Sequence, residues 1–371
     1  MRVLVLNMAM QRGRRAFIVD WVAELAGQVE HVDVFTMTTT DEPVPANVRV
    51  WSLGKERGHS TLRRVAVFYQ RLRRVLDGDR IDVCFVHMVP IFAIMAAPFL
   101  RVRRVPMVMW YAHRSLTWKL RLAHRLVKVI VSVNEQSYPY RKDKLVAVGH
   151  GIDTSRYQPG IGPVERDLII SVGRVSPIKD LTMLVEAVRL LRERGLCLRC
   201  VIVGAPPRRD RYYQRKLERT IAAHALEGVV RLVGAQDPDD VVGWYQRCAV
   251  HVNCSPRNHS VDKAPLEAMA CGRPTLSSIA ALAETMGRYE DTLLFDEGSE
   301  GDLVVKLHAL LMRSPAEIEE MGLYLRTRVE MLHGLAPQSQ RLVGILRRAA
   351  QSSRPERSIS PDETGVDGAS R

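Results

Sequence analysis

Residues 257–274 read Arg-Asn-His-Ser-Val-Asp-Lys-Ala-Pro-Leu-Glu-Ala-Met-Ala-Cys-Gly-Arg-Pro. The stretch begins with polar residues that predict a loop, continues into a helix that carries one glutamate, Glu267, and stops at Gly272 and Pro274. The first backbone N–H groups of such a helix lack intrahelical partners, so its N-terminus can bind an anion. Taken alone, the stretch fits an ordinary helix with a good stop signal equally well, so the rest of the chain must decide.

On either side of this stretch, short apolar strands alternate with amphipathic helices. Strands are predicted at 3–6, 32–36, 48–52, 83–87, 107–110, 129–133 and 145–148, and then at 168–172, 197–203, 229–233 and 250–253. Repeated strand-helix-strand units predict parallel sheets with helices on both faces. The sequence therefore predicts an α/β protein of two Rossmann-like domains, with a ligand in the cleft at the carboxyl ends of their strands.

The domain boundaries follow from composition. Turn residues gather at 149–163, so we place a first domain at 1–158 and a second at 159–350. Residues 351–371 are rich in Ser, Pro, Gly and charge, which predicts a disordered tail. A length of 371 residues fits two domains of ordinary size.

Cysteine use and hydropathy predict a cytoplasmic protein. The six cysteines are scattered in apolar or helical contexts and follow no secretory leader, which predicts reduced, buried thiols. The most apolar run, 83–100, is interrupted by His87 and Pro90, so it predicts a strand and a buried helix rather than a transmembrane span.

Positive charge is concentrated in the first half of the chain. Residues 1–160 carry 25 Lys and Arg against 13 Asp and Glu, whereas residues 161–371 carry 29 against 28. In the predicted helix 62–76, an apolar stripe is flanked by five arginines; the stripe consists of Leu62, Val65, Tyr69, Leu72 and Val75. Such a helix either packs against the protein with a solvated arginine face or lies on an anionic membrane. In the second case the protein would be peripheral on the inner face of the membrane. No recognisable nucleic-acid-binding motif is present, so we expect no nucleic-acid partner.

Two cations follow the predicted strand 168–172. The loop Gly173-Arg-Val-Ser-Pro-Ile-Lys-Asp180 places Arg174 and Lys179 at the carboxyl end of a parallel strand. An arginine fork and a lysine point charge together suit a diphosphate, although a solvated loop would carry the same residues. Asp180 is predicted to cap the next helix.

Three stretches together resemble a known family. They are Gly173-Arg-x-x-x-Pro-x-Lys-Asp180, Pro265-Leu-Glu-Ala-Met-Ala-Cys-Gly-Arg-Pro274 and Val148-Gly-His-Gly-Ile-Asp153. In this order they resemble the retaining nucleotide-sugar glycosyltransferases of family 4, which have the GT-B fold of two Rossmann-like domains facing across a cleft. The Asp-Lys pair before Leu-Glu-Ala-Met-Ala resembles a variant of that family.

The resemblance implies roles for particular residues. Arg174 and Lys179, beside Gly173, would bind the donor diphosphate and stabilise the leaving nucleoside diphosphate. Glu267 would accept hydrogen bonds from the donor ribose, and His113 would lie in the cleft near the reacting sugar. The implied catalytic residues are therefore His113, Arg174 and Lys179.

One position departs from the family pattern. The family carries a sugar-contacting glutamate eight residues before its ribose glutamate, where this chain has His259. Asp262 is a candidate substitute, and equally a candidate N-cap with Pro265 at the third helical position. With Ser260 and Lys263, these residues complete the predicted nucleotide-sugar-binding stretch.

The implied reaction is a metal-independent, retaining hexosyl transfer from a nucleotide-diphosphate sugar to a saccharide or lipid-linked acceptor, in cell-surface polysaccharide synthesis. The donor sugar nucleotide is a substrate, and no further cofactor is expected. The alternative, suggested by His259, is a catalytically degenerate homologue that binds nucleotide sugars. A nicotinamide dehydrogenase is disfavoured because neither half shows Gly-x-Gly-x-x-Gly after a strand.

Overall fold

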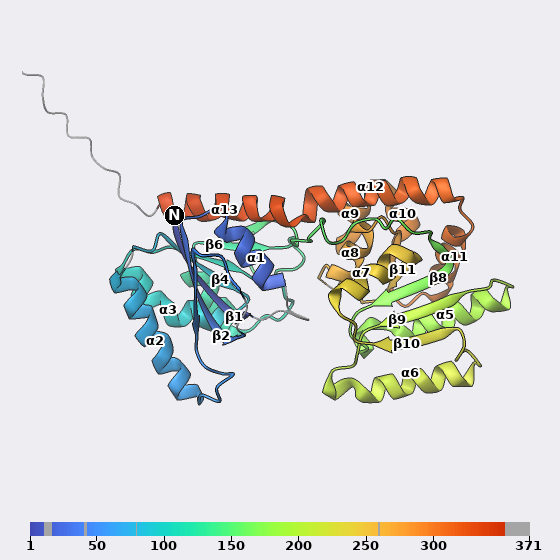
Figure 1. Ribbon diagram of the computed structural model, residues 1–371, viewed down its shortest axis with the longest axis horizontal. Helices are drawn as coiled ribbons and strands as arrows, with labels where there is room; N and C mark the ends of the chain where they lie inside the picture. Colours follow the sequence, from blue (N-terminus) through green and yellow to red (C-terminus); the bar gives the residue numbers. More distant parts are fainter. Residues whose placement is uncertain (11–16, 41–42, 79, 259, 353–371) are drawn as a thin grey trace, which may run out of the picture.

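The computed structural model describes residues 1–10, 17–40, 43–78, 80–258 and 260–352. These residues form two parallel β-sheets, which lie side by side with helices around each (Figure 1). The predicted α/β class with two parallel-sheet units is confirmed. The predicted tail from residue 353 onward lies outside the described residues.

The first sheet has the strand order β3-β2-β1-β4-β5-β6-β7. Successive residues of β1 point to opposite faces: Val3 and Val5 enter one hydrophobic cluster, and Leu4 and Leu6 enter another. Both faces are therefore covered, which explains why its strands are almost continuously apolar. The elements are β1 (Arg2–Met10), α1 (Phe17–Ala26), β2 (His31–Thr39), β3 (Val48–Ser52), α2 (Thr61–Gly78), β4 (Val83–His87), α3 (Pro90–Val102), β5 (Met107–Trp110), α4 (Trp118–Leu126), β6 (Val129–Ser132) and β7 (Leu145–Ala147).

The second sheet has the order β10-β9-β8-β11-β12, so β8 lies between β9 and β11. Its first strand in the chain is thus central, and the loops after β8 and β11 leave the sheet at its carboxyl edge. The elements are β8 (Glu165–Val172), α5 (Leu181–Glu193), β9 (Arg199–Val203), α6 (Arg211–Ala223), β10 (Val230–Gly234), α7 (Pro238–Arg247), β11 (Cys248–Asn253), α8 (Lys263–Ala270), β12 (Thr275–Ser277), α9 (Ala283–Met286), α10 (Glu290–Leu293), α11 (Glu300–Leu311) and α12 (Pro315–His333).

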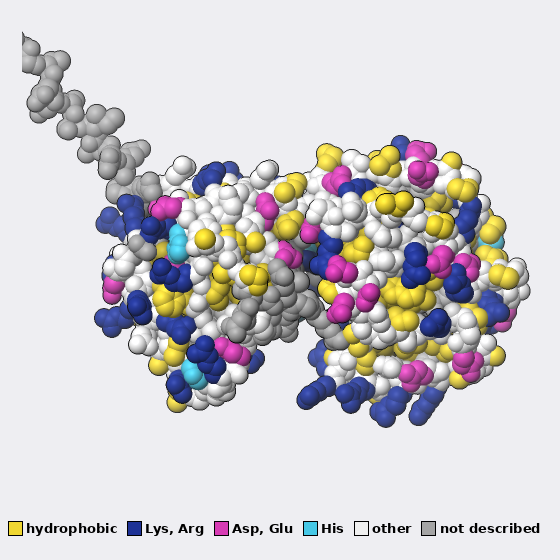
Figure 2. All heavy atoms as spheres, in the orientation of Figure 1, with side chains coloured by type: hydrophobic (Ala, Val, Ile, Leu, Met, Phe, Trp, Pro, Cys, Tyr) yellow, Lys and Arg dark blue, Asp and Glu magenta, His cyan; other side chains and the backbone are white. Residues whose placement is uncertain are grey.

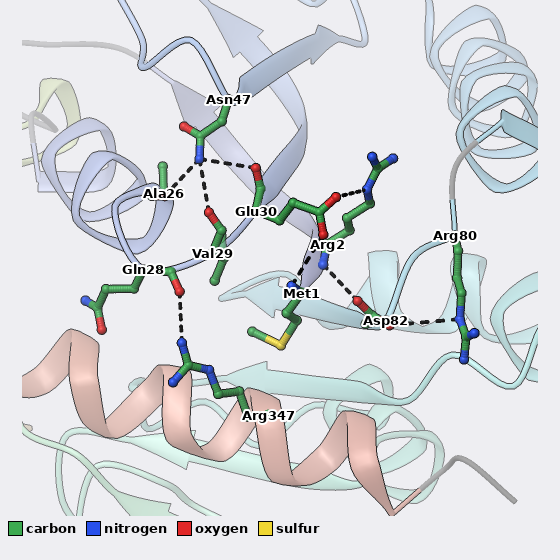
Figure 3. Close-up of polar contacts among 10 residues, drawn as sticks. All are labelled: Met1, Arg2, Ala26, Gln28, Val29, Glu30, Asn47, Arg80, Asp82 and Arg347. Atoms are coloured by element: carbon green, nitrogen blue, oxygen red, sulfur yellow. Dashed lines mark hydrogen bonds and ion pairs between the residues drawn. The ribbon is translucent and has the colours of Figure 1, made fainter. Parts of the chain in front are cut away.

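The last described helix, α13 (Leu335–Gln351), returns to the first sheet (Figure 1). Trp21 Nε1 of α1 donates to Gln338 Oε1 at 3.0 Å, and Arg347 donates to the Gln28 carbonyl at 3.0 Å (Figure 3). The sequence analysis assigned residues through 350 to the second domain, whereas α13 contacts α1, β4 and β5 of the first domain as well as α12. An amphipathic pattern shows that a helix has a buried face but not which sheet covers it.

The arginine-flanked helix α2 is packed on one face and exposed at its N-terminal end. Leu72 and Val75 are buried, but Leu62 and Val65, at its N-terminal end, are 84% and 37% exposed. The guanidinium of Arg71 lies 5.6 Å from the ring centre of Trp51, so part of the arginine face is packed. Figure 2 shows Lys and Arg side chains spread over the first domain and also in a row along α6. No helix in the described ranges is long and apolar enough to cross a membrane.

The cysteines largely follow the prediction of buried thiols. Five of the six are buried, whereas Cys197 is exposed. Cys197 precedes β9, which begins only at Arg199, so the strand predicted from residue 197 starts too early. The thiol is exposed because it lies in the loop before the strand.

Candidate active site

A cavity of about 360 Å³ lies at the carboxyl edge of the second sheet. Residues from both domains line it, since Asp20 of α1 faces residues of the second domain across it. The connecting segment 151–157 forms another wall. This is the position at which ligands bind to open α/β sheets. The predicted site residues that line this cavity are Gly173, Arg174, Lys263 and Glu267.

The loops after β8 and β9 form the floor of the cavity, and each begins with a glycine. Gly173 directly follows β8, and Gly204 directly follows β9. Gly204 has φ +145°, and a Cβ built on it would lie only 1.7 Å from the Gly173 carbonyl oxygen. The absence of a side chain therefore lets the two loops touch. Arg174 follows, with an exposed side chain that lines the cavity.

Lys179 is buried beside this floor rather than in the cavity lining. It is 9% exposed, and its Nζ donates to Ser255 Oγ at 3.1 Å and forms an ion pair with the Asp262 carboxylate. Its Nζ lies 4.0 Å from the point where a Cβ on Gly173 would stand, which places the ammonium next to the cavity floor. Lys179 therefore lies close to the cavity, as predicted for this loop, but its charge is paired with the Asp262 carboxylate.

Asp262 is at the N-cap position of α8, with Pro265 at the third helical position. Its side chain makes no cap hydrogen bond, and it accepts from Asn253 Nδ2 and Ser255 Oγ, each at 3.3 Å, as well as pairing with Lys179. Asp180 likewise precedes α5 without a cap hydrogen bond, because its backbone is left-handed, with φ 38°. The predicted N-cap hydrogen bonds of both residues are therefore absent.

Helix α8 carries a charged pair into the cavity, Lys263 in its first turn and Glu267 one turn later. Burial raises the pKa of Glu267. The positive charge of Lys263 and the Tyr245 hydroxyl, which donates to Glu267 Oε2 at 3.1 Å, both oppose that rise. Burial lowers the pKa of Lys263 to about 7, against the opposing effect of Glu267 and Asp20. The cavity therefore contains a lysine whose charge changes near neutral pH.

The first domain contributes less than predicted. His113 follows β5 in an exposed loop, where the Ser115 backbone N–H donates to its Nδ1 at 3.0 Å. It is not among the residues that line the cavity. Two other histidines are electrostatically coupled to Lys263: burial and Lys263 lower the pKa of His87 to about 4 and that of His150 to about 3.

Sequence reasoning missed several residues of the cavity. Tyr157 and Gly204 line it, and Tyr245 supports Glu267 from behind. A glycine directly after a strand is a signal for Gly204, whereas isolated tyrosines give none. Ser260 is half-buried before α8 and is not among the lining residues. His259 lies outside the described residues.

Two protein families match the chain, one on each domain. A family described as glycosyl transferase 4-like domain matches residues 12–138, and one described as glycosyl transferases group 1 matches residues 166–313. Each domain therefore matches a family of glycosyltransferases. The second match contains β8 from residue 166 onward, α8 and the whole loop that holds Arg174 and Lys179, so the candidate site lies mainly in the group 1 region.

Curated relatives of this chain are glycosyltransferases with different names. The D-inositol 3-phosphate glycosyltransferase of Kineococcus radiotolerans is 27% identical over 241 residues, which cover 59% of this chain and 55% of the relative. The putative colanic acid biosynthesis glycosyltransferase WcaL of Escherichia coli is 27% identical over 199 residues, 51% of this chain and 47% of the relative. The chain thus spans about half the length of these relatives.

Solved structures extend the similarity to nearly the whole chain. Anabaena Alr3699/HepE in complex with UDP has a TM-score of 0.75 at 14% identity, covering 94% of this chain and 100% of that one. Sucrose-phosphate synthase from Thermosynechococcus elongatus has a TM-score of 0.77 at 16% identity, covering 95% and 100%. At such identities these structures establish the fold, which is the GT-B arrangement of two facing domains.

Proposed function

We propose that this chain transfers a hexosyl group, with retention of configuration and without a metal ion, from a nucleotide-diphosphate sugar to a saccharide or lipid-linked acceptor. The observation that carries this proposal is the cavity in which Arg174, Lys263 and Glu267 converge at the carboxyl edge of the second sheet. Two cations and one carboxylate are what a nucleoside diphosphate requires, because the phosphates are anionic and the ribose hydroxyls donate hydrogen bonds.

The structure supports a division of roles among the charged groups. Arg174 has an exposed guanidinium that can take two phosphate oxygens at once. Lys263 lines the cavity in the first turn of α8, near the N–H groups of that helix. Lys179 lies behind the floor in an ion pair with Asp262, and we assign it to the diphosphate, toward which its ammonium turns when the donor binds.

In the proposed reaction, the bond between the sugar C1 and the leaving phosphate oxygen breaks as the acceptor oxygen bonds to C1 on the same face. The acceptor hydroxyl proton passes to the leaving phosphate. The negative charge that develops on the nucleoside diphosphate is stabilised by Arg174 and the lysines, which supply the role a metal ion has in other transferases. His113 would have to approach the sugar through closure of the domains, since its loop is exposed here.

We further propose that the acceptor is lipid-linked and that the first domain faces an anionic membrane from the cytoplasmic side. Support comes from the charge surplus of residues 1–160 and from Leu62 and Val65, which α2 leaves exposed beside its arginines. Exposed apolar residues next to basic ones are typical of helices that bind anionic membrane surfaces. A role in cell-surface polysaccharide synthesis would fit such an acceptor.

A transfer assay with paired variants tests the site. Arg174→Ala and Lys179→Ala are each expected to lower kcat by about 100-fold or more, because each removes charge stabilisation of the leaving group. Arg192→Ala, at an exposed position on α5, is the matched control and should retain activity. If the Arg174→Ala, Lys179→Ala double variant transferred sugar at the wild-type rate, the site assignment would be wrong.

The alternative is a degenerate homologue that binds the donor without transfer. The Lys179–Asp262 ion pair favours it, since that pair withdraws one predicted phosphate ligand from the cavity. The two possibilities differ in nucleotide release. A transferase releases nucleoside diphosphate in proportion to added acceptor, whereas a degenerate homologue releases none at any acceptor concentration.

A further inference from the structure

A second cavity, of about 520 Å³, lies in the second domain away from the candidate active site. It is bounded by the segment that leads into β8, the turn after α8, the end of α11 and the first turns of α12. No residue in the described part of the chain lines both this cavity and the first. Much of its wall is aliphatic, with Val164, Val250, Leu310, Leu311 and Ile318 among its residues.

One buried cation lines this aliphatic cavity. Arg273 is only 8% exposed, and its Nε is buried without a hydrogen-bond partner among the described residues. Its backbone N–H donates to the Ala268 carbonyl at 3.0 Å, which fixes the residue against the end of α8. A buried guanidinium is strongly unfavourable unless an anion accepts its hydrogen bonds.

The protein itself does not supply that anion within the described ranges. No carboxylate there pairs with Arg273, and the groups that act on it electrostatically are the thiols of Cys248 and Cys271. Burial raises the pKa of both thiols to about 12, so both stay neutral at physiological pH. Burial in turn lowers the pKa of Arg273, which reflects the uncompensated charge.

The charges around the cavity select the kind of anion. Among the described residues of the lining, Arg166 is the one cation besides Arg273 and Glu319 is the one carboxylate, and both are exposed. The surplus is therefore a single positive charge, which matches a monoanion better than a dianionic phosphate. A guanidinium fork binds a carboxylate through two parallel hydrogen bonds, and the aliphatic wall accommodates a hydrocarbon chain.

We propose that this cavity binds a monocarboxylate with a short aliphatic chain, with the carboxylate on Arg273 and the chain along Leu310, Leu311 and Ile318. The site is separate from sugar transfer and does not depend on the proposed function. Because Arg273 lies in the turn that follows α8, the helix that carries Glu267, and its backbone N–H donates to the Ala268 carbonyl of that helix, occupancy is well placed to affect the active site.

Octanoate is a suitable probe, with octanol and octyl phosphate as comparison ligands in calorimetric titrations of the full chain. Octanoate should bind saturably, whereas octanol should bind at least tenfold more weakly because it lacks the charge. Arg273→Met, which keeps length and apolarity, should weaken octanoate binding at least tenfold. It should leave nucleoside diphosphate binding unchanged, because the two cavities share no residue.

A second variant keeps the proposal open to refutation if Arg273→Met does not fold. Ile318→Trp adds bulk at a half-buried position in the wall and should weaken octanoate binding without touching Arg273. Failure of octanoate to bind the wild-type chain, or equal binding by either variant, would overturn the proposal. Preferential binding of octyl phosphate would overturn the assignment to a monocarboxylate.

Discussion

Replacing Glu267 by glutamine changes the charge of one carboxylate while keeping its shape. Glu267 lines the cavity from α8 and accepts a hydrogen bond from Tyr245 at 3.1 Å. Glutamine retains one carbonyl acceptor at this position and removes the negative charge. Since the proposed partners are the two ribose hydroxyls of the donor, the substitution should weaken nucleotide binding.

The expected size follows from the difference between two kinds of hydrogen bond. Bonds to a charged group contribute about 1.5–3 kcal/mol, against about 0.5–1.5 kcal/mol for neutral pairs. The loss is therefore about 1 kcal/mol for each hydroxyl and about 2 kcal/mol for the ribose. That corresponds to a Kd raised roughly 30-fold.

Isothermal titration at pH 7.5 with a nucleoside diphosphate and its 2′-deoxy analogue measures this directly. In the wild-type chain, removal of the 2′-hydroxyl removes a bond to a charged group and should weaken binding about tenfold or more. In Glu267→Gln the same change should have a smaller effect, because the charged acceptor is already gone. Glu284→Gln, at an exposed position on α9, controls for the loss of one negative charge.

The comparison of two proteins with two ligands separates a ribose contact from a general electrostatic effect. If the 2′-deoxy analogue lost the same free energy in the wild-type chain and in Glu267→Gln, Glu267 would not contact that hydroxyl. If Glu267→Gln bound the nucleotide as tightly as the wild-type chain, the ribose role would be refuted altogether.

Three further outcomes follow from the structure. Because the pKa of Lys263 is about 7, nucleoside diphosphate affinity should fall by up to tenfold per pH unit above that value, and Lys263→Met should remove this dependence in titrations from pH 6 to 9. His251 has no exposed surface and its pKa is lowered to about 3, so its contribution to stability is complete above about pH 6.5 and is lost as the pH falls toward 3. His251→Phe should therefore flatten the decline in urea midpoint between pH 6.5 and 4, and an unchanged slope would contradict this. Finally, the chain should co-sediment with anionic liposomes at low salt, and Leu62→Glu with Val65→Glu should release it, whereas Val305→Glu, 60% exposed on the other domain, should not.

The sequence predicted the sheets well, because their strands are buried on both faces. Each predicted strand of the first domain overlaps a strand of the structure, as with residues 83–87 and β4. Elements with weak patterns were not identified: β12 has three residues, and α7 has a single buried side chain, Tyr245. The placement of α13 on the first sheet depends on tertiary contacts such as Trp21 with Gln338, which local periodicity cannot reveal.

The candidate site shows the same limit at the level of side chains. The strand pattern predicted that Gly173, Arg174 and Glu267 lie at one edge of a sheet, as expected for parallel strands, and they line one cavity there. It could not show that Lys179 pairs with Asp262, because those residues come from different loops. Nor could it show that Lys263 has a pKa near 7, because burial arises from tertiary packing and the opposing charge of Asp20 comes from the other domain.

The central claim is that the cavity holds a nucleotide-diphosphate sugar. The most direct measurement is the unfolding temperature of the chain with UDP-, GDP-, dTDP- and ADP-sugars, compared between the wild-type chain and Arg174→Ala. A ligand that binds the folded state alone at 100 times its Kd stabilises that state by about 2.7 kcal/mol. We predict that one donor raises the unfolding temperature saturably in the wild-type chain and that Arg174→Ala loses most of this shift. The absence of a shift with every donor, or an equal shift in Arg174→Ala, would contradict the claim that the cavity holds a nucleotide-diphosphate sugar.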